Sequence, residues 1–144
     1  MPALKLHCAT LRVEMDRGPS IADITADLEH VITAAKITSG SLAACMTGST
    51  GALTTIEFEP GVVQDLKRAI NRLAPPQDVY EHEKAWHDGN GHSHVQAALL
   101  GPSIHLPVRR GRLQLGTWQQ AVAINHDARA RSRHIEVTVI GSTA

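Results

Sequence analysis

The sequence is short of cysteine and of aromatic residues, and these shortages exclude several kinds of protein. Only Cys8 and Cys45 occur among the 144 residues, so neither a disulfide framework nor a cysteine-based zinc knuckle is available. We expect both to be small core residues rather than nucleophiles. Aromatic side chains make up 3%, fewer than a stacking platform for single-stranded bases needs.

The chain also lacks a long hydrophobic run and an excess of one charge. No stretch approaches the roughly 18 apolar residues of a membrane span, and the first residues lack the apolar centre of a signal peptide. Lys and Arg total 14, as do Asp and Glu, whereas dedicated nucleic-acid domains are basic. We therefore expect a cytoplasmic protein with no nucleic-acid or membrane partner, folded as a single domain over 1–144. Near-zero net charge permits self-association.

Hydrophobic patterning predicts an α+β fold with a mainly antiparallel sheet, two longer helices and one short helix. The helices are expected at 21–37, from Pro60 to about Ala74, and at 94–100. The strands are expected at 4–15, 41–47, 52–58, 103–108, 113–124 and 133–140. The strands at 41–47 and 52–58 form either a hairpin or two linked strands.

Histidine is unusually frequent, and a cluster of it surrounds a glycine-rich loop. Of nine histidines, four fall within thirteen residues: His82, His87, His92 and His94. Gly89 and Gly91 let the loop approach a ligand closely. The helix predicted after Ser93 directs its free N–H groups toward this loop, which favours an anion site.

His92 and His94 are two residues apart, so their relation depends on the local backbone. On an extended chain they share a side and can hold one metal ion or one phosphate, whereas on a helix they diverge by about 200 degrees. The shared-ligand hypothesis therefore requires both residues to precede the helix. Asp88, His87 and His82 are possible further ligands or proton carriers. The alternative is a solvated loop whose histidines have no role.

Four other places in the sequence are candidates for a site. The 47–51 segment, Thr-Gly-Ser-Thr-Gly, either binds phosphate through hydroxyls and amides or is simply a turn. Glu57 is either the solvent-facing side of a strand or a buried acid or base. Gly116, in a predicted strand, suggests close approach of a ligand or backbone. The alternating arginines of 129–133 either bind phosphate, pair with a neighbouring subunit, or are solvated.

The ordered motifs between Asp88 and Gln119 resemble one known family. They are Asp88-Gly89-Asn90-Gly91-His92-Ser93-His94, Ala97-Ala98-Leu99-Leu100-Gly101-Pro102-Ser103, and Leu115-Gly116-Thr117-Trp118-Gln119. With Ser49-Thr50, Glu57 and the closing arginines, this pattern is similar to the YjbQ family, also named secondary thiamine-phosphate synthase, over nearly the whole chain. Gly48 departs from the family, which usually has His before its hydroxyl pair, and the 125–129 turn also differs.

The resemblance implies a compact α+β homotrimer with thiamine-phosphate synthase activity. Such an enzyme joins an aminopyrimidine pyrophosphate to a thiazole phosphate and releases pyrophosphate. The matching positions imply catalytic Glu57, Asp88, His92 and His94, and substrate-binding Ser49, Thr50, Asn90, Gly91, Thr117 and Gln119.

In this hypothesis the glycine loop and the helix start at Ser93 bind phosphate. His92 and His94 hold a divalent ion (Mg or Zn) or neutralise the leaving pyrophosphate, and Glu57 or Asp88 is the general base or a metal ligand. Two alternatives stand beside it. One is a non-catalytic protein that binds a metal or a phosphorylated small molecule, which the loss of His at Gly48 favours. The other is a hydrolytic metalloenzyme with His82 or Asp88 as a third ligand.

Overall fold

The longest strands form a five-stranded antiparallel sheet. The computed structural model describes residues 3–143. In sheet order the strands are β1 (Lys5–Met15), β8 (Arg131–Ser142), β3 (Ser39–Met46), β5 (Ser103–Arg109) and β6 (Arg112–Leu113). Buried and exposed side chains alternate along β3, β5 and β8, as expected where one face of a sheet is covered. The strands predicted at 4–15, 41–47, 103–108 and 133–140 are confirmed.

A second, three-stranded antiparallel sheet lies next to the first. It contains β2 (Ser20–Asp23), β7 (Gln119–Asn125) and β4 (Gly51–Glu57), in that order. β3 and β4 therefore lie in different sheets, so they are linked strands and not a hairpin. The 47–50 loop joins the two sheets.

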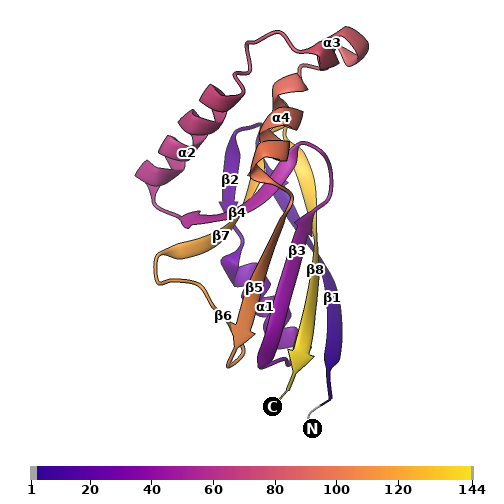
Figure 1. Cartoon of the computed structure of the whole chain (residues 1–144), viewed down its shortest axis with the longest axis vertical. Coiled ribbons are helices and arrows are strands. Elements are labelled where there is room, and N and C mark those ends of the chain that lie inside the picture. The colour runs from indigo at the N-terminus through magenta and orange to yellow at the C-terminus, as the bar shows by residue number, and fades with distance from the viewer. Residues whose placement is uncertain (1–2, 144) are drawn as a thin grey trace.

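Residues 3–143 contain four helices: α1 (Thr25–Ala35), α2 (Pro60–Leu73), α3 (Glu81–Trp86) and α4 (Gly91–Leu100). α1 packs behind the five-stranded sheet, while α2 and α4 lie beside the three-stranded one (Figure 1). The Glu59 side chain caps α2 by accepting hydrogen bonds from the N–H groups of Gly61 and Val62. None of the helices within residues 3–143 is long and apolar enough to span a membrane.

The predicted fold class is confirmed, but two predicted elements were wrong in detail. Residues 20–23 do not begin a helix, because they pair with β7 from Ser20 opposite Asn125 to Asp23 opposite Val122. The spacing of Ile21 and Ile24 fits either structure, and pairing with β7 decides between them. The single strand predicted at 113–124 is interrupted by a turn, in which the N–H of Gly116 donates to Gln119 Oε1 at 3.0 Å.

The apolar core has two parts, one on each face of the three-stranded sheet. The larger part joins α1 to both sheets, with Leu28, Ile32, Leu42 and Val137 almost fully buried. The smaller part consists of Ala52, Ile70, Val122 and Ile124, under α2 and α4. β7 is therefore buried on both faces, which explains its unbroken apolar run at 121–124.

The outer face of the five-stranded sheet is open to solvent in the isolated chain. Leu6 and Ile140 on this face are 63% and 45% exposed. Cys8 and Cys45 are exposed as well, so the prediction that they are core residues was wrong. The cause is the strand period of two, because apolar neighbours such as Ala44 and Met46 take the inward positions.

Candidate functional site

A network of polar side chains lies at the end of β7, centred on the buried carboxylate of Asp127. Asp127 is 1% exposed and receives hydrogen bonds on both oxygens. Oδ2 accepts from Thr50 Oγ1 at 2.9 Å and from Arg131 Nε at 3.0 Å. Oδ1 accepts from Asn90 Nδ2 at 3.2 Å and from the Arg129 N–H at 2.9 Å. A carboxylate this deep in the protein is stable only with such partners.

The partners of Asp127 determine its protonation state. Burial alone would raise the pKa of Asp127, but the hydrogen bonds from Arg129, Arg131, Thr50 and Asn90 together hold it below the usual value. The group is therefore ionised at neutral pH. Because both of its oxygens are occupied, it is a structural anion and not a free base.

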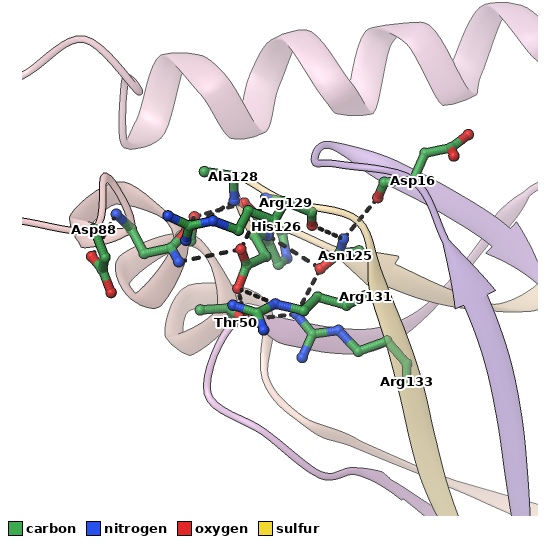
Figure 2. Close-up of polar contacts among 12 residues, drawn as sticks. Asp16, Thr50, Asp88, Asn125, His126, Ala128, Arg129, Arg131 and Arg133 are labelled. Carbon is green, nitrogen blue, oxygen red and sulfur yellow. Dashed lines mark hydrogen bonds and ion pairs between the residues drawn. The ribbon is translucent and has the colours of Figure 1, made fainter.

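Arg133 is the second buried charge of the network. It is 6% exposed, and its Nη2 donates to Thr50 Oγ1 and to Asn125 Oδ1, each at 2.6 Å. Figure 2 shows Arg131 and Arg133 reaching from β8 to the same place as Thr50. Burial lowers the pKa of Arg133, and the nearby Asp127 carboxylate acts in the opposite direction. The guanidinium is nevertheless charged at neutral pH.

Part of the Arg133 guanidinium has no partner among the described residues. The Arg133 Nε is buried without a hydrogen bond. Both hydrogen bonds of the guanidinium are made by Nη2. Nη1 lies 3.0 Å from where a Cβ would stand on Gly48. Gly48 has a φ of 101°, which glycine adopts readily. The 47–50 loop therefore leaves room beside a charged donor.

These groups line a depression of about 390 Å³, which we call the polar hollow. Its lining consists of Thr47, Gly48, Ser49, Thr50, Asp88, Asn90, His94, Asp127, Arg131, Ser132, Arg133 and His134. The loop is fixed because the N–H and Oγ1 of Thr47 both donate to the His134 carbonyl. The volume suits a small molecule. A larger open depression of about 550 Å³ lies between Pro19 and α2, and its lining contains no carboxylate or imidazole.

An apolar hollow adjoins the polar one. It has a volume of about 360 Å³ and is lined by Gly48, Ser49, Gly51, His94, Ala97, Ala98 and Pro102. Gly48, Ser49 and His94 line both hollows, so the two are continuous. Together they form a depression that is polar at one end and apolar at the other.

The glycine-rich loop does form an anion site, but the protein fills it with its own carboxylate. Glu83 Oε2 accepts from the Gly89 N–H and Oε1 from the Gly91 N–H, both at 2.8 Å. These two backbone bonds lower the pKa of Glu83. Gly91 also packs tightly, since a Cβ there would come within 2.4 Å of the Tyr80 Cβ. The predicted phosphate site at this loop is therefore not available.

α4 begins at Gly91, three residues before the predicted start. Ser93 is fully buried inside the first turn, with its hydroxyl 2.7 Å from the His126 carbonyl and 2.9 Å from Asn90 Oδ1. His92 and His94 are both on the helix, so their side chains diverge. His92 is buried, and burial lowers its pKa. His94 lines both hollows. The condition for these two rings to share one ion is thus not met.

The structure brings together some of the predicted site residues and separates the others. Ser49, Thr50, Asp88, Asn90 and His94 line the polar hollow. Gly91 and His92 are buried in the first turn of α4 and do not line the hollow.

Glu57, Thr117 and Gln119 are exposed, and they lie away from the hollow within one chain. Glu57 pairs with Gln119, whereas Gly51 pairs with Asn125 at the hollow. Six residues along a strand correspond to roughly 20 Å.

Sequence reasoning missed the role of His126, which is 1% exposed. The Gln96 amide holds it, since Gln96 Nε2 donates to the Ala74 carbonyl at 3.0 Å and its Oε1 is 2.9 Å from His126 Nδ1. This fixes the proton on Nδ1, and the buried Nε2 has no partner among residues 3–143. Burial lowers the pKa of His126 to about 4. The available signal was the abrupt change from the apolar 121–124 run to three polar residues.

Comparison with known proteins shows which family the chain belongs to. The family model described as "UPF0047 protein YjbQ-like" matches residues 9–142. A UPF0047 protein of Archaeoglobus fulgidus is 32% identical over 130 residues, covering 90% of this chain and 98% of that protein. The UPF0047 protein YugU of Bacillus subtilis is 31% identical, covering 89% and 96%.

Solved structures agree with this assignment. A YbjQ-like protein of unknown function from Sulfolobus solfataricus is 29% identical, with a TM-score of 0.92 over 97% of this chain and 100% of that one. A hypothetical protein from Aeropyrum pernix is 27% identical, with a TM-score of 0.87 over 94% and 98%. The same fold and the matching sequence extend over nearly the whole chain. The chain therefore belongs to the YjbQ (UPF0047) family.

Proposed function

We propose that the polar hollow binds the phosphate groups of a small molecule, and that the protein is a thiamine-phosphate synthase-like transferase. The observation that carries this proposal is Arg133. It is a buried cation held by Thr50 and Asn125, and its Nη1 makes no hydrogen bond within the described chain beside Gly48. Planar guanidinium groups are suited to bidentate recognition of phosphate.

The surroundings of Arg133 support a phosphorylated ligand with a ring. Arg131 adds a second guanidinium, and Ser49 adds an exposed hydroxyl without a hydrogen bond among the described residues. The apolar hollow behind them is lined by Ala97, Ala98 and Pro102. An aminopyrimidine pyrophosphate has this division between a charged end and a flat ring.

The proposed reaction needs charge stabilisation more than proton transfer. The thiazole nitrogen forms a bond to the methylene carbon of the pyrimidine, while the bond from that carbon to the pyrophosphate oxygen breaks. The leaving group keeps the electron pair, and the nitrogen has no proton to lose. Arg131 and Arg133 would stabilise the negative charge that develops on the pyrophosphate. A free general base is therefore not required, which agrees with the occupied carboxylate of Asp127.

The proposal includes a homotrimer, which would use surfaces that are exposed in one chain. Leu6 and Ile140 stand on the open face of the five-stranded sheet. Trp118 is 74% and Phe58 43% exposed, next in sequence to Gln119 and Glu57. A subunit docked on such surfaces would bury this apolar area and offers a route for the residues at the far end of β4 to approach a neighbouring hollow.

The activity is tested by supplying aminopyrimidine pyrophosphate and thiazole phosphate with magnesium and measuring thiamine phosphate. We expect product from the native protein and at least a tenfold lower rate from Arg133→Lys, which keeps the charge but loses the planar fork. Arg109→Gln, an exposed arginine on β5, should react at the native rate. Product no higher than with heat-killed protein would remove this activity. Binding of the pyrophosphate without turnover would instead support the non-catalytic alternative.

A further inference from the structure

We propose that His82, Asp88 and His94 form a site for one divalent transition-metal ion at the rim of the polar hollow. The three residues come from α3, from the loop after it and from α4. The site rests on and deepens the function proposed above, because Asp88 and His94 line the same hollow as Arg131 and Arg133. Its occupancy can nevertheless be measured without any assumption about the reaction.

The first observation is an imidazole nitrogen with no hydrogen-bond partner among residues 3–143. His82 Nδ1 is buried and makes no hydrogen bond among residues 3–143. The atoms facing it are carboxylate oxygens, Asp88 Oδ1 at 3.4 Å and Glu83 Oε1 at 3.5 Å. The ligand atoms of His82, Glu83 and Asp88 lie within 4.8 Å of one another, and His94 is not in this group. A buried nitrogen is thus directed at acceptors without bonding to them.

The spacing fits two atoms that share a metal ion. Two ligand atoms at zinc-like bond lengths on adjacent corners of a tetrahedron lie about 3.4 Å apart. The separation of His82 Nδ1 and Asp88 Oδ1 equals this value. The same separation is longer than the usual 2.7–2.9 Å of a charge-assisted hydrogen bond between an imidazolium and a carboxylate. A shared metal ion therefore explains the distance better than a direct ion pair does.

We assign His94 as the third ligand because its ring packs against the ring of His82. Its ring centroid is 4.6 Å from that of His82, with the planes inclined at 47°. Two imidazoles bound to one zinc ion have centroids about 5 Å apart. His94 and Asp88 also line the polar hollow. Three protein ligands with a fourth position open toward a cavity is the arrangement of a reactive metal site and not of a closed structural one.

Glu83 is a positioning residue for this site and not a ligand. Both Glu83 oxygens accept backbone hydrogen bonds at 2.8 Å, one from the Gly89 N–H and one from the Gly91 N–H. These bonds hold the loop that directly follows Asp88. Asp88 itself is less constrained. Its Oδ1 accepts one bond from the Asn90 N–H at 3.0 Å, and Figure 2 shows the Asp88 side chain standing apart from the dashed network of the arginines.

The donor atoms and the local charge indicate the kind of ion. Imidazole nitrogens favour zinc and similar ions over magnesium, which prefers oxygen. Around the hollow the two arginines are balanced by Asp88 and Asp127, so the formal charge is zero with neutral histidines. A divalent ion would make the hollow positive by two charges. It would thus convert a neutral depression into one that prefers a pyrophosphate.

The site is tested by titrating chelator-treated protein with Co²⁺, whose visible absorption reports tetrahedral nitrogen and oxygen ligands, and then displacing it with Zn²⁺. We expect one Co²⁺ per chain. His82→Ala, His94→Ala and Asp88→Ala should each weaken binding at least 100-fold, since loss of an outer hydrogen-bond partner alone costs 10–100-fold. His105→Ala, an exposed histidine on β5, should bind as the native protein does. No saturable binding, or equal binding by His82→Ala and His105→Ala, would overturn the site.

A second measurement keeps the test valid if a variant fails to fold. Substoichiometric Co²⁺ added to the native protein should broaden the ring signals of His82 and His94 in NMR spectra before that of His105. Unaffected His82 signals would overturn the site. The two proposals also fail separately. Stoichiometric Co²⁺ binding without any thiamine phosphate removes the proposed function, whereas full product formation by metal-free protein overturns a role for the ion.

Discussion

Replacing Asp127 by Asn should lower the free energy of unfolding by about 3–5 kcal/mol, the usual cost of breaking a buried ion pair. Four donors point at the two Asp127 oxygens. The Asn side chain has only one acceptor oxygen, and its NH₂ group would face donors that now bond to the second Asp127 oxygen. The change also leaves Arg133 buried near Arg131 without the compensating charge. Urea unfolding followed by circular dichroism measures the difference.

The matched control is Asp65→Asn, which removes an exposed carboxylate paired with Arg68 on α2. Both groups of this pair are more than two-thirds exposed, so the change should cost less than about 1 kcal/mol. Equal effects of the Asp127 and Asp65 variants would show that the buried network does not hold this end of the molecule together.

Acidification should destabilise the native protein by about 2 kcal/mol between pH 7.5 and pH 5 through His126 alone. Burial lowers the pKa of His126 to about 4, whereas an unfolded histidine titrates near 6.5. Below pH 6.5 the unfolded chain therefore binds a proton that the folded chain refuses. The loss begins near pH 6.5 and is complete near pH 4.

The measurement is the free energy of unfolding at pH 7.5 and pH 5 for the native protein, His126→Gln and His105→Gln. The His126 variant starts from a lower stability but should lose about 2 kcal/mol less on acidification. The His105 variant should follow the native protein, since His105 is exposed on β5. An unchanged pH dependence in His126→Gln would mean that this imidazole is not kept neutral by burial.

The sheets were predictable because most strands show an alternation of apolar and polar residues in the sequence. β8 alternates apolar and polar residues, and β1 pairs with it along its whole length. Pro60 and Pro75 frame α2. The strand at Ser20–Asp23 was not predictable, since Ile21 fits a helix as well and only β7 decides its conformation.

The candidate site was predictable in its residues more than in its geometry. The sequence pointed to the 47–51 segment and to the alternating arginines of 129–133, and the structure places residues 47–50 with Arg131 and Arg133 around one hollow. It could not reveal that Arg133 is buried while Arg131 is partly exposed, because both belong to the same polar run. The burial of Arg133 depends on Thr50, from the 47–50 loop, and on Asn125, from β7.

The prediction that the glycine loop binds an anion was correct, but the anion is a side chain of the protein and not a ligand. Backbone amides at Gly89 and Gly91 do attract an anion, as predicted. The anion is Glu83, eight residues before Gly91, and no local pattern distinguishes an internal carboxylate from a ligand phosphate. The bond from the Gly91 N–H to Glu83 lies at the first residue of α4. Because α4 begins at Gly91, His92 and His94 are both helical and point in different directions. The ring that contacts His94 is that of His82.

Whether the polar hollow receives a phosphate group is tested most directly by calorimetric titration of the metal-loaded protein with pyrophosphate. We expect one pyrophosphate per chain, an affinity at least tenfold lower for Arg133→Lys, and native affinity for Arg109→Gln. An absence of binding, or equal affinities for the two arginine variants, would contradict a phosphate site at Arg133.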